Sequence, residues 1–178
     1  MGAPFAANEA GEASVFYGGS AGLSTAGNQL WRGSGRANEW FGAALAGADL
    51  DGNGLADLAV GVPLGNLVAA SGEQIGDAGW VAVVYGRSSG LSASGIQFWH
   101  QARKGIADDI EPRDRFGSAL AAAAFGNGRR GDLAVGVPLE DVGTVGTRTL
   151  RASRVLPRRA TSSGSPSARS ASGAHERT

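Results

Sequence analysis

The chain has 178 residues, of which 30 are glycine and none is cysteine, and its 16 acidic and 16 basic side chains give a formal net charge of zero. Without cysteine it can form no disulfide, no thiolate metal site and no cysteine nucleophile. Helices so rich in glycine would be weak, so the composition favours a turn-rich all-β fold.

The sequence shows neither a membrane-spanning segment nor a secretion signal. Its longest apolar run, residues 58–70, is interrupted by Pro63 and Asn66 and is shorter than the roughly 20 residues that a spanning helix needs. Residues 1–19 carry acidic side chains and lack the basic start and continuous apolar stretch of a signal peptide. We therefore expect no membrane insertion, and no signal peptide is visible.

The first element in chain order, residues 13–39, contains two predicted strands whose pattern returns further along. Phe-Tyr-Gly at 16–18 and Leu-Trp at 30–31 reappear about 68 residues later as Val-Tyr-Gly at 84–86 and Phe-Trp at 98–99. Between the members of each pair stands the same tripeptide, Gly-Leu-Ser. We interpret residues 13–39 as the last two strands of one repeated sheet.

The second element, residues 40–100, is predicted to contain a complete repeat. We expect four short strands, bounded by Gly, Pro or Asn, at residues 41–46, 57–62, 80–85 and 96–100. Four strands in about 60 residues suit one blade of a β-propeller, in which sheets pack face to face around an axis.

The third element, residues 101–142, repeats the beginning of the second. Phe-Gly of 41–42 returns at 116–117, and Asp-Leu-Ala-Val-Gly-Val-Pro-Leu of 57–64 returns unchanged at 132–139. Intrinsic propensity would make the alanine-rich stretch 119–124 helical. The repeat equates that stretch with a strand, and we therefore predict the first half of another blade.

These residues resemble the FG-GAP repeats of the propeller in integrin α subunits. Phe41-Gly42 and Phe116-Gly117 correspond to the Phe-Gly of that family, and Gly61-Val62-Pro63 and Gly136-Val137-Pro138 to its Gly-Ala-Pro. The resemblance covers about residues 13–142. It implies a partial β-propeller of four-stranded blades, about two blades' worth, from a protein that is extracellular or at the cell surface.

Residues 147–178 do not continue the repeat. They contain seven arginines and one acidic residue, and they are rich in serine and alanine without a period. We expect a disordered tail, and a shifted reading frame in a GC-rich gene is the alternative explanation. Because no aromatic side chain accompanies the arginines, we expect no nucleic-acid binding.

The loop before residue 57 places oxygen-bearing side chains at alternate positions. Asp49, Asp51, Asn53 and Asp57 occupy loop positions 1, 3, 5 and 9, and the backbone carbonyl of Leu55 adds another oxygen. This spacing suits Ca²⁺, which accepts about 6 to 8 oxygens at flexible angles. The resemblance assigns the same five residues to the metal; an acidic β-turn without an ion is the alternative.

The third element contains a degenerate copy of this loop. Residues 124–132 keep only Asp132 at a ligand position and carry Arg129 and Arg130 where the ion would be. We predict that this copy binds no metal. An EF-hand is also disfavoured, because its bidentate glutamate at position 12 is replaced by Val60.

Other motifs are interpreted as structural. Gly18–Gly22 and Gly86–Gly90 fit the G-x-S-x-G nucleophile elbow, but each precedes a predicted strand rather than a helix. Arg130-Gly131-Asp132 is interpreted as a chance tripeptide. Four acidic residues before the Phe-Gly pairs are interpreted as parts of solvated loops: Glu39, Asp109, Glu111 and Asp114. We predict no catalytic residue.

Three functions fit these observations. The first is a calcium-binding scaffold for adhesion or ligand binding, with a protein or a carbohydrate as its partner. The second is the non-catalytic propeller part of a secreted hydrolase similar to phospholipase D, and the third is a truncated gene fragment without function. A propeller with few blades leaves sheet faces and edges bare, so self-association is also expected.

Overall fold

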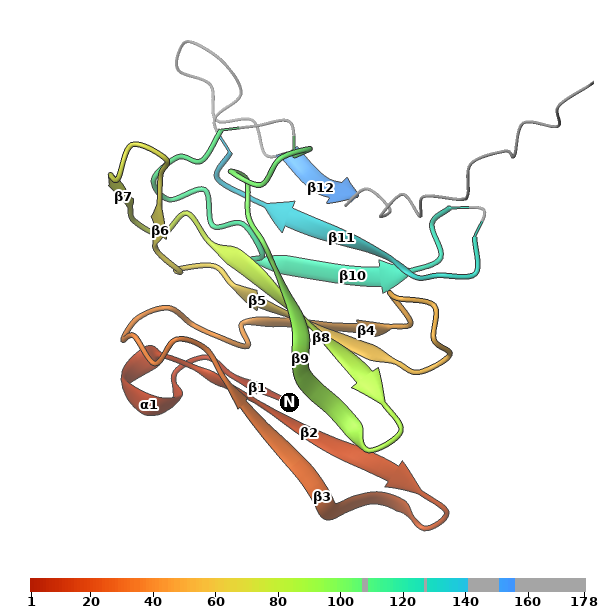
Figure 1. Ribbon diagram of the computed structural model, residues 1–178. Helices are drawn as coiled ribbons and strands as arrows, with labels where there is room; N and C mark the ends of the chain where they lie inside the picture. Colours follow the sequence, from red (N-terminus) through yellow and green to blue (C-terminus); the bar gives the residue numbers. More distant parts are fainter. Residues whose placement is uncertain (107–108, 127, 141–150, 156–178) are drawn as a thin grey trace, which may run out of the picture.

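The computed structural model describes residues 1–106, 109–126, 128–140 and 151–155, and within them the chain folds into three stacked antiparallel sheets (Figure 1). The all-β prediction is confirmed. The strands of the first sheet are β1 (Gly2–Ala3), β2 (Glu12–Gly19) and β3 (Gly22–Arg32). Those of the second are β4 (Ala44–Ala48), β5 (Asp57–Val62), β8 (Trp80–Arg87) and β9 (Gly90–Trp99). Those of the third are β10 (Ala119–Ala123), β11 (Asp132–Val137) and β12 (Arg151–Val155).

The second sheet is the complete blade that the sequence predicts, with the strand order β4-β5-β8-β9. β5 has the predicted bounds, but the first strand begins at Ala44 rather than at residue 41. Gly42 there has a φ of +88°, a conformation that a strand does not adopt. A small hairpin of β6 (Leu67–Val68) and β7 (Gln74–Ile75), which the sequence analysis did not anticipate, extends the connection from β5 to β8.

The first sheet contains one strand more than predicted. Gly2 and Ala3 of β1 pair with Ala13 and Glu12, as Gly61 and Val62 pair with their β8 partners. The tripeptide Gly-Ala-Pro at 2–4 is thus the counterpart of Gly-Val-Pro at 61–63. The first predicted element began at residue 13 and therefore did not include this strand, although the tripeptide at 2–4 was a signal for it. The single turn α1 (Ala6–Glu9) follows.

The third sheet repeats the start of the second. The alanine-rich stretch forms β10 and not a helix, and it pairs with β11 in the register that β4 has with β5. Residues 151–155, which the sequence analysis places in the tail, lie antiparallel to β11 as β12. The rest of the predicted tail lies outside the described residues, and the prediction of disorder there stays a prediction.

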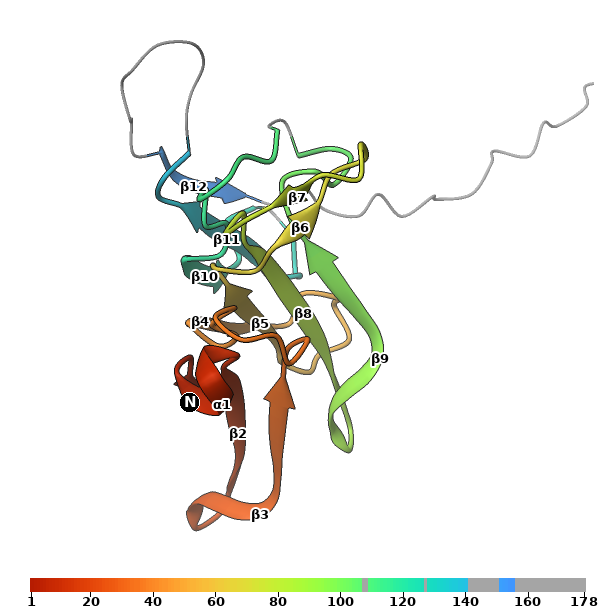
Figure 2. The ribbon, with the colours of Figure 1, turned by 90° about the vertical axis from the view of Figure 1, so that its left-hand side faces the viewer.

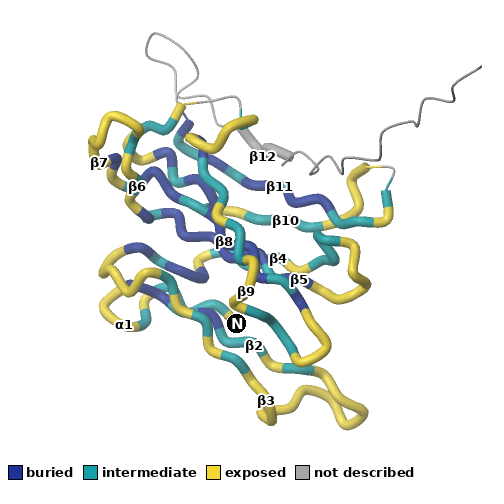
Figure 3. Tube along the Cα trace, viewed as in Figure 1, coloured by how far each residue is buried: buried dark blue, intermediate teal, exposed yellow. Residues whose placement is uncertain are grey.

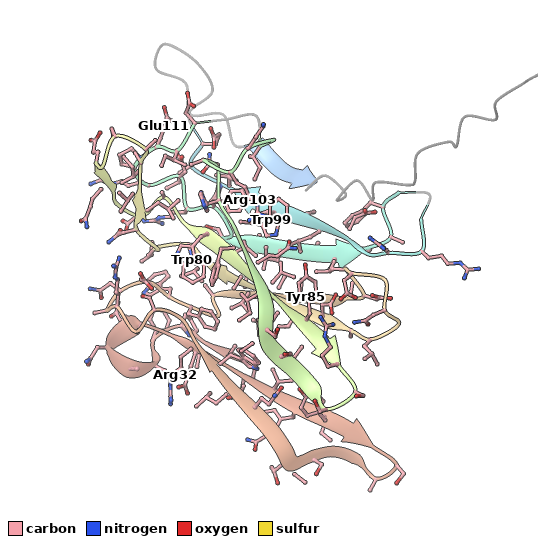
Figure 4. All side chains as sticks on the ribbon, viewed as in Figure 1. Arg32, Trp80, Tyr85, Trp99, Arg103 and Glu111 are labelled. Carbon is pink, nitrogen blue, oxygen red and sulfur yellow. The ribbon has the colours of Figure 1, made fainter. Side chains whose placement is uncertain are left out.

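Apolar side chains fill the two spaces between the sheets; Figure 2 shows the sheets stacked one on another, and Figure 3 shows buried residues along their strands. Residues of β5 alternate between them: Val60 and Val62 pack with Phe41 toward the first sheet, and Ala59 packs with Phe116 toward the third. Both phenylalanines are at most 3% exposed. Trp80 packs against Phe41 and Arg103 lies over Trp99 (Figure 4). Among the described residues, no helix has the length and apolarity to cross a membrane.

Backbone hydrogen bonds join consecutive sheets at equivalent places. The N–H of Phe41 donates to the carbonyl of Ala10 over 2.9 Å, and the N–H of Phe116 donates to the carbonyl of Ala78 over the same distance. Two further backbone bonds on the N-terminal side of each phenylalanine repeat in the same register. The Phe-Gly motif therefore marks the point at which the backbone of one sheet is bonded to that of the preceding sheet.

The backbone contact between consecutive sheets leaves no room for a side chain at the glycine of Gly-Val-Pro. A Cβ on Gly61 would lie 2.1 Å from the carbonyl oxygen of Gly117, and a Cβ on its counterpart Gly2 would lie 2.0 Å from the carbonyl oxygen of Gly42. The obstructing atoms belong to the backbone, so the sheets would have to separate to admit a methyl group.

We predict that Gly61→Ala lowers the free energy of unfolding by about 1–3 kcal/mol, the usual cost of overpacking a close contact. The matched control is Gly18→Ala, because a Cβ on Gly18 meets no atom within 4 Å. Urea unfolding followed by tryptophan fluorescence measures both variants. Equal stability of the two variants would contradict the steric role of Gly61.

Candidate metal centre

The acidic loop connects β4 to β5 at the edge of the second sheet (Figure 1). The structure brings three of the predicted ligands together: one carboxylate oxygen each from Asp49, Asp51 and Asp57 lies within 4.8 Å of the others. Carboxylates this close repel one another unless a cation or a proton offsets their charge. The structure thus shows a cluster of three carboxylates, a type of group that a hard cation can bind, while the assignment of these residues to a cation stays a prediction.

Asp49 shapes the first half of the loop. Its Oδ1 accepts the N–H groups of Gly52 (2.6 Å) and Asn53 (3.0 Å), and its Oδ2 accepts that of Gly54 (2.9 Å). Gly52 and Gly54 have φ values of +81° and +85°, a left-handed conformation that glycine adopts without strain. The turn therefore wraps the backbone around the Asp49 carboxylate.

Asp57 is the buried acid of the loop, with an exposed fraction of 2%. Its Oδ2 accepts the N–H groups of Leu50 (2.7 Å) and Asp51 (3.1 Å), and its Oδ1 accepts that of Gly86 (2.8 Å). Burial raises the pKa of the Asp57 carboxyl above its ordinary value; the three N–H groups lower that pKa and the charge of Asp51 raises it. Asp57 thus joins the loop to β8.

The two remaining predicted ligands lie in the same loop, but no contact in the structure tests their role. The Oδ1 of Asn53 accepts the N–H of Leu55 (2.7 Å), and the Nδ2 of Asn53 donates to the carbonyl of Gly86 (3.0 Å). Asp51 forms an ion pair with Arg87 at 3.1 Å. The assignment of Asn53 and of the Leu55 carbonyl to a cation stays a prediction.

The degenerate loop of the third sheet lies against the acidic loop. The N–H of Gly131 donates to the carbonyl of Asp49 over 2.6 Å. The side chain of Arg130 leaves its own loop, and its Nε would lie 2.7 Å from a Cβ on Gly52. Asp132, which is 8% exposed, accepts the N–H of Gly126 as Asp57 accepts that of Asp51. The last acid of the loop therefore organises the backbone even where the other acids are absent.

The structure supports the structural interpretation of the remaining motifs. Gly18–Gly22 and Gly86–Gly90 span the connections of the hairpins β2–β3 and β8–β9, so neither precedes a helix. Asp132 begins β11 and is buried, which removes it from the surface at which a short peptide motif would be recognised.

Two acids before the Phe-Gly pairs correct the sequence analysis. Glu39 and Asp114 are 3% and 1% exposed and are not solvated. Glu39 accepts a hydrogen bond from the hydroxyl of Ser34 at 2.5 Å, and Asp114 accepts the N–H of Glu111 at 2.7 Å. Through these hydrogen bonds each carboxylate fixes the loop that precedes its own Phe-Gly pair, where consecutive sheets are joined. Their burial depends on sheet packing, which no local pattern reveals.

Comparison with known proteins places this loop in a repeat. Residues 41–84 match the model of the FG-GAP repeat. The chain is also similar to phosphatidylinositol-glycan-specific phospholipase D of Rattus norvegicus, with 37% identity over 98 residues, and to the proteins of the same name from Mus musculus and Bos taurus, with 36% each. The matched stretch is 55% of this chain but 11% of each relative.

We predict that Asp57→Ala destabilises the fold even in the presence of EDTA. The substitution leaves the buried N–H of Gly86 and the partly buried N–H groups of Leu50 and Asp51 without their acceptor, and a buried group left unpaired costs about 1–3 kcal/mol. Asp51→Ala is the matched control, because its contacts, an ion pair with Arg87 and two hydrogen bonds from Asn53, lie at the exposed surface of the loop, where an ion pair contributes only about 0–1 kcal/mol. Thermal unfolding in EDTA distinguishes the two; similar melting temperatures would contradict the role of Asp57.

Proposed function

We propose that this chain, which carries an FG-GAP repeat at residues 41–84, is a calcium-stabilised propeller module that serves as an extracellular scaffold for adhesion or ligand binding. The observation that carries the proposal is the convergence of the Asp49, Asp51 and Asp57 carboxylates. The ligand of the scaffold is a protein or a carbohydrate.

The chemistry of the donor set favours calcium over other ions. The loop offers carboxylate, amide and carbonyl oxygens, and the chain has no cysteine to favour a soft metal. Calcium tolerates the irregular geometry of a loop, whereas magnesium demands octahedral coordination and retains its waters. Extracellular EF-hand modules bind calcium with dissociation constants of about 10⁻⁴–10⁻³ M. We expect an affinity in this range for the acidic loop, which lies at the surface.

The ion would act as a structural staple rather than as a catalyst. It would offset the repulsion among the three carboxylates and fix the connection between β4 and β5. Because Gly131 of the third sheet donates to the Asp49 carbonyl, a fixed acidic loop also steadies the junction between the second and third sheets. The module would then present its other loops to a ligand in a fixed arrangement.

A second function is favoured by the similarity to phosphatidylinositol-glycan-specific phospholipase D. The chain would then be a non-catalytic propeller part of a secreted hydrolase. A catalytic domain encoded in the same reading frame would favour this function over adhesion. A third alternative, a gene fragment without function, requires that the chain fails to fold; soluble expression with cooperative unfolding would exclude it.

We predict that calorimetric titration finds about one calcium site per chain. At a free calcium concentration 100 times the Kd, one site adds about 2.7 kcal/mol to the free energy of unfolding. Asp51→Asn should weaken binding by about tenfold or more, since it removes the charge of one ligand. Asp109→Asn, which lies outside the loop, is the matched control. The absence of both binding heat and a shift in melting temperature at millimolar calcium would contradict the proposal.

We also predict that the calcium affinity falls as the pH is lowered toward the raised pKa of Asp57. Calcium binds the ionised carboxylate, so protons compete from a higher pH than they would at an exposed aspartate, with a loss approaching about tenfold per pH unit below that pKa. In EDTA the sign is reversed: the raised folded-state pKa contributes stability at low pH that is lost as the pH rises through it. Calcium titrations between about pH 4 and pH 7 measure how the affinity depends on pH, and thermal unfolding in EDTA over the same range measures how the stability does. This range covers a raised aspartate pKa. A calcium affinity that is constant down to the ordinary pKa of aspartate would contradict the prediction.

A further inference from the structure

An arginine of the second sheet binds the acidic loop. Arg87 is the last residue of β8, and its Nη1 donates to the Oδ2 of Asp51 over 3.1 Å and to the carbonyl of Gly86 over 2.7 Å. Its guanidinium carbon lies 5.7 Å from the centre of the Tyr85 ring, which is labelled in Figure 4, within the range of a cation–π contact. A positive charge of the chain itself is therefore held against one of the three clustered carboxylates.

The carboxylate of Asp51 is held differently from the other two. Asp49 and Asp57 each accept three backbone N–H groups and use both oxygens to do so. Asp51 accepts the backbone N–H of Asn53 at Oδ1, whereas its Oδ2 accepts two side-chain donors, Arg87 Nη1 and Asn53 Nδ2. A side-chain donor leaves by changing its rotamer, whereas a backbone donor is fixed by the fold. The Oδ2 of Asp51 is thus the oxygen of the cluster that changes partner most readily.

The β8–β9 hairpin does not need an arginine at this position. In the first sheet Gly19 is the counterpart of Arg87, because Gly19 pairs with Gly22 as Arg87 pairs with Gly90, and both hairpins have a register shift before the tyrosine. The side chain of Arg87 is 43% exposed, so a displaced guanidinium reaches water without crossing the core. Arg87 therefore acts on the neighbouring loop rather than on its own turn.

We propose that Arg87 is an exchangeable counter-cation of the acidic loop, which holds Asp51 while calcium is absent and leaves it when calcium binds. The inference rests on the proposed function, since calcium is the ion that takes the place of the guanidinium. Both cations compete for the Oδ2 of Asp51, and a guanidinium that stayed beside that oxygen would be repelled by the divalent ion. Arg87 thus sets the calcium affinity of the loop below the affinity of the acids alone.

The exchange has opposite effects with and without the ion. Without calcium, the guanidinium relieves part of the repulsion among the three carboxylates, so the loop keeps its shape. With calcium, only the fraction of molecules in which Asp51 is free of Arg87 binds at full affinity, and the apparent affinity falls by that fraction. One substitution at Arg87 is therefore expected to weaken the calcium-free fold and to strengthen calcium binding.

Arg87→Gln tests the exchange, because glutamine keeps a polar side chain and removes the charge. Its calcium affinity, measured by calorimetric titration at low ionic strength, should exceed that of the wild type at least about threefold, since an exposed ion pair changes an equilibrium constant up to about fivefold. Loss of the repulsion between guanidinium and calcium acts in the same direction. Arg87→Lys, which keeps the charge, should stay closer to the wild type than to Arg87→Gln.

Arg32→Gln is the matched control. Arg32 forms an exposed ion pair with Glu12 at 3.2 Å, and in Figure 4 it lies on the first sheet, apart from Tyr85 on β8. Removal of this pair should leave the calcium affinity within about twofold of the wild type, because salt and water screen exposed charges that are far from the loop.

Thermal unfolding provides a readout without calcium. In EDTA at low ionic strength, Arg87→Gln should melt at a lower temperature than Arg32→Gln, because it leaves a cluster of carboxylates without its cation rather than a single one. Saturating calcium should remove this difference, since the variant that binds calcium more tightly is stabilised more. Added sodium chloride should reduce it as well.

The outcomes separate the exchange from the proposed function. A wild-type chain that binds calcium, together with an Arg87→Gln chain of equal affinity, would overturn the exchange and leave the calcium site intact. Calcium binding by Arg87→Gln but not by the wild type would support the exchange and contradict the calcium-stabilised module. No binding by either chain would overturn both, and equal melting of Arg87→Gln and Arg32→Gln in EDTA would overturn the exchange alone.

Discussion

The rest of the structure depends on the close approach of backbone to backbone between consecutive sheets. Phe41 and Phe116 donate their N–H groups to the preceding sheet, and Gly61 lies where a methyl group would strike the carbonyl of Gly117. Once the sheets are this close, each phenylalanine side chain enters the apolar layer between them. A packed interior of this density tolerates little displacement, so the loops at the edges of the sheets are also brought into register.

The contacts of the acidic loop depend on this alignment of the sheets. Its last acid, Asp57, binds the backbone of its own loop and of β8, and the neighbouring loop docks on the Asp49 carbonyl through Gly131. Asp132 persists in the degenerate loop with one of the same backbone contacts. A carboxylate at this position is therefore a backbone acceptor in both loops, and under the proposed function it would also be a cation ligand where the other acids accompany it.

The acidic loop and the side chain of Gln29, which binds the backbone of Leu91, join neighbouring sheets at different places. Each sheet buries its faces only against neighbouring sheets, so stability in a repeat architecture resides largely in the interfaces between units. A cation at the acidic loop would steady the second and third sheets, and Gln29 ties the first sheet to the second. A fold built this way gains rigidity from every sheet that packs against its neighbour.

The sequence by itself determined the strand pattern and the residues of the acidic loop, because both are written locally and twice: residues 57–64 and 132–139 are identical, and glycine and proline mark the strand ends. Tertiary structure alone decided that Glu39 and Asp114 are buried and that Gln29 binds the backbone of Leu91. These features depend on partners brought close only when the sheets stack, and no local period records which distant backbone group a side chain will meet.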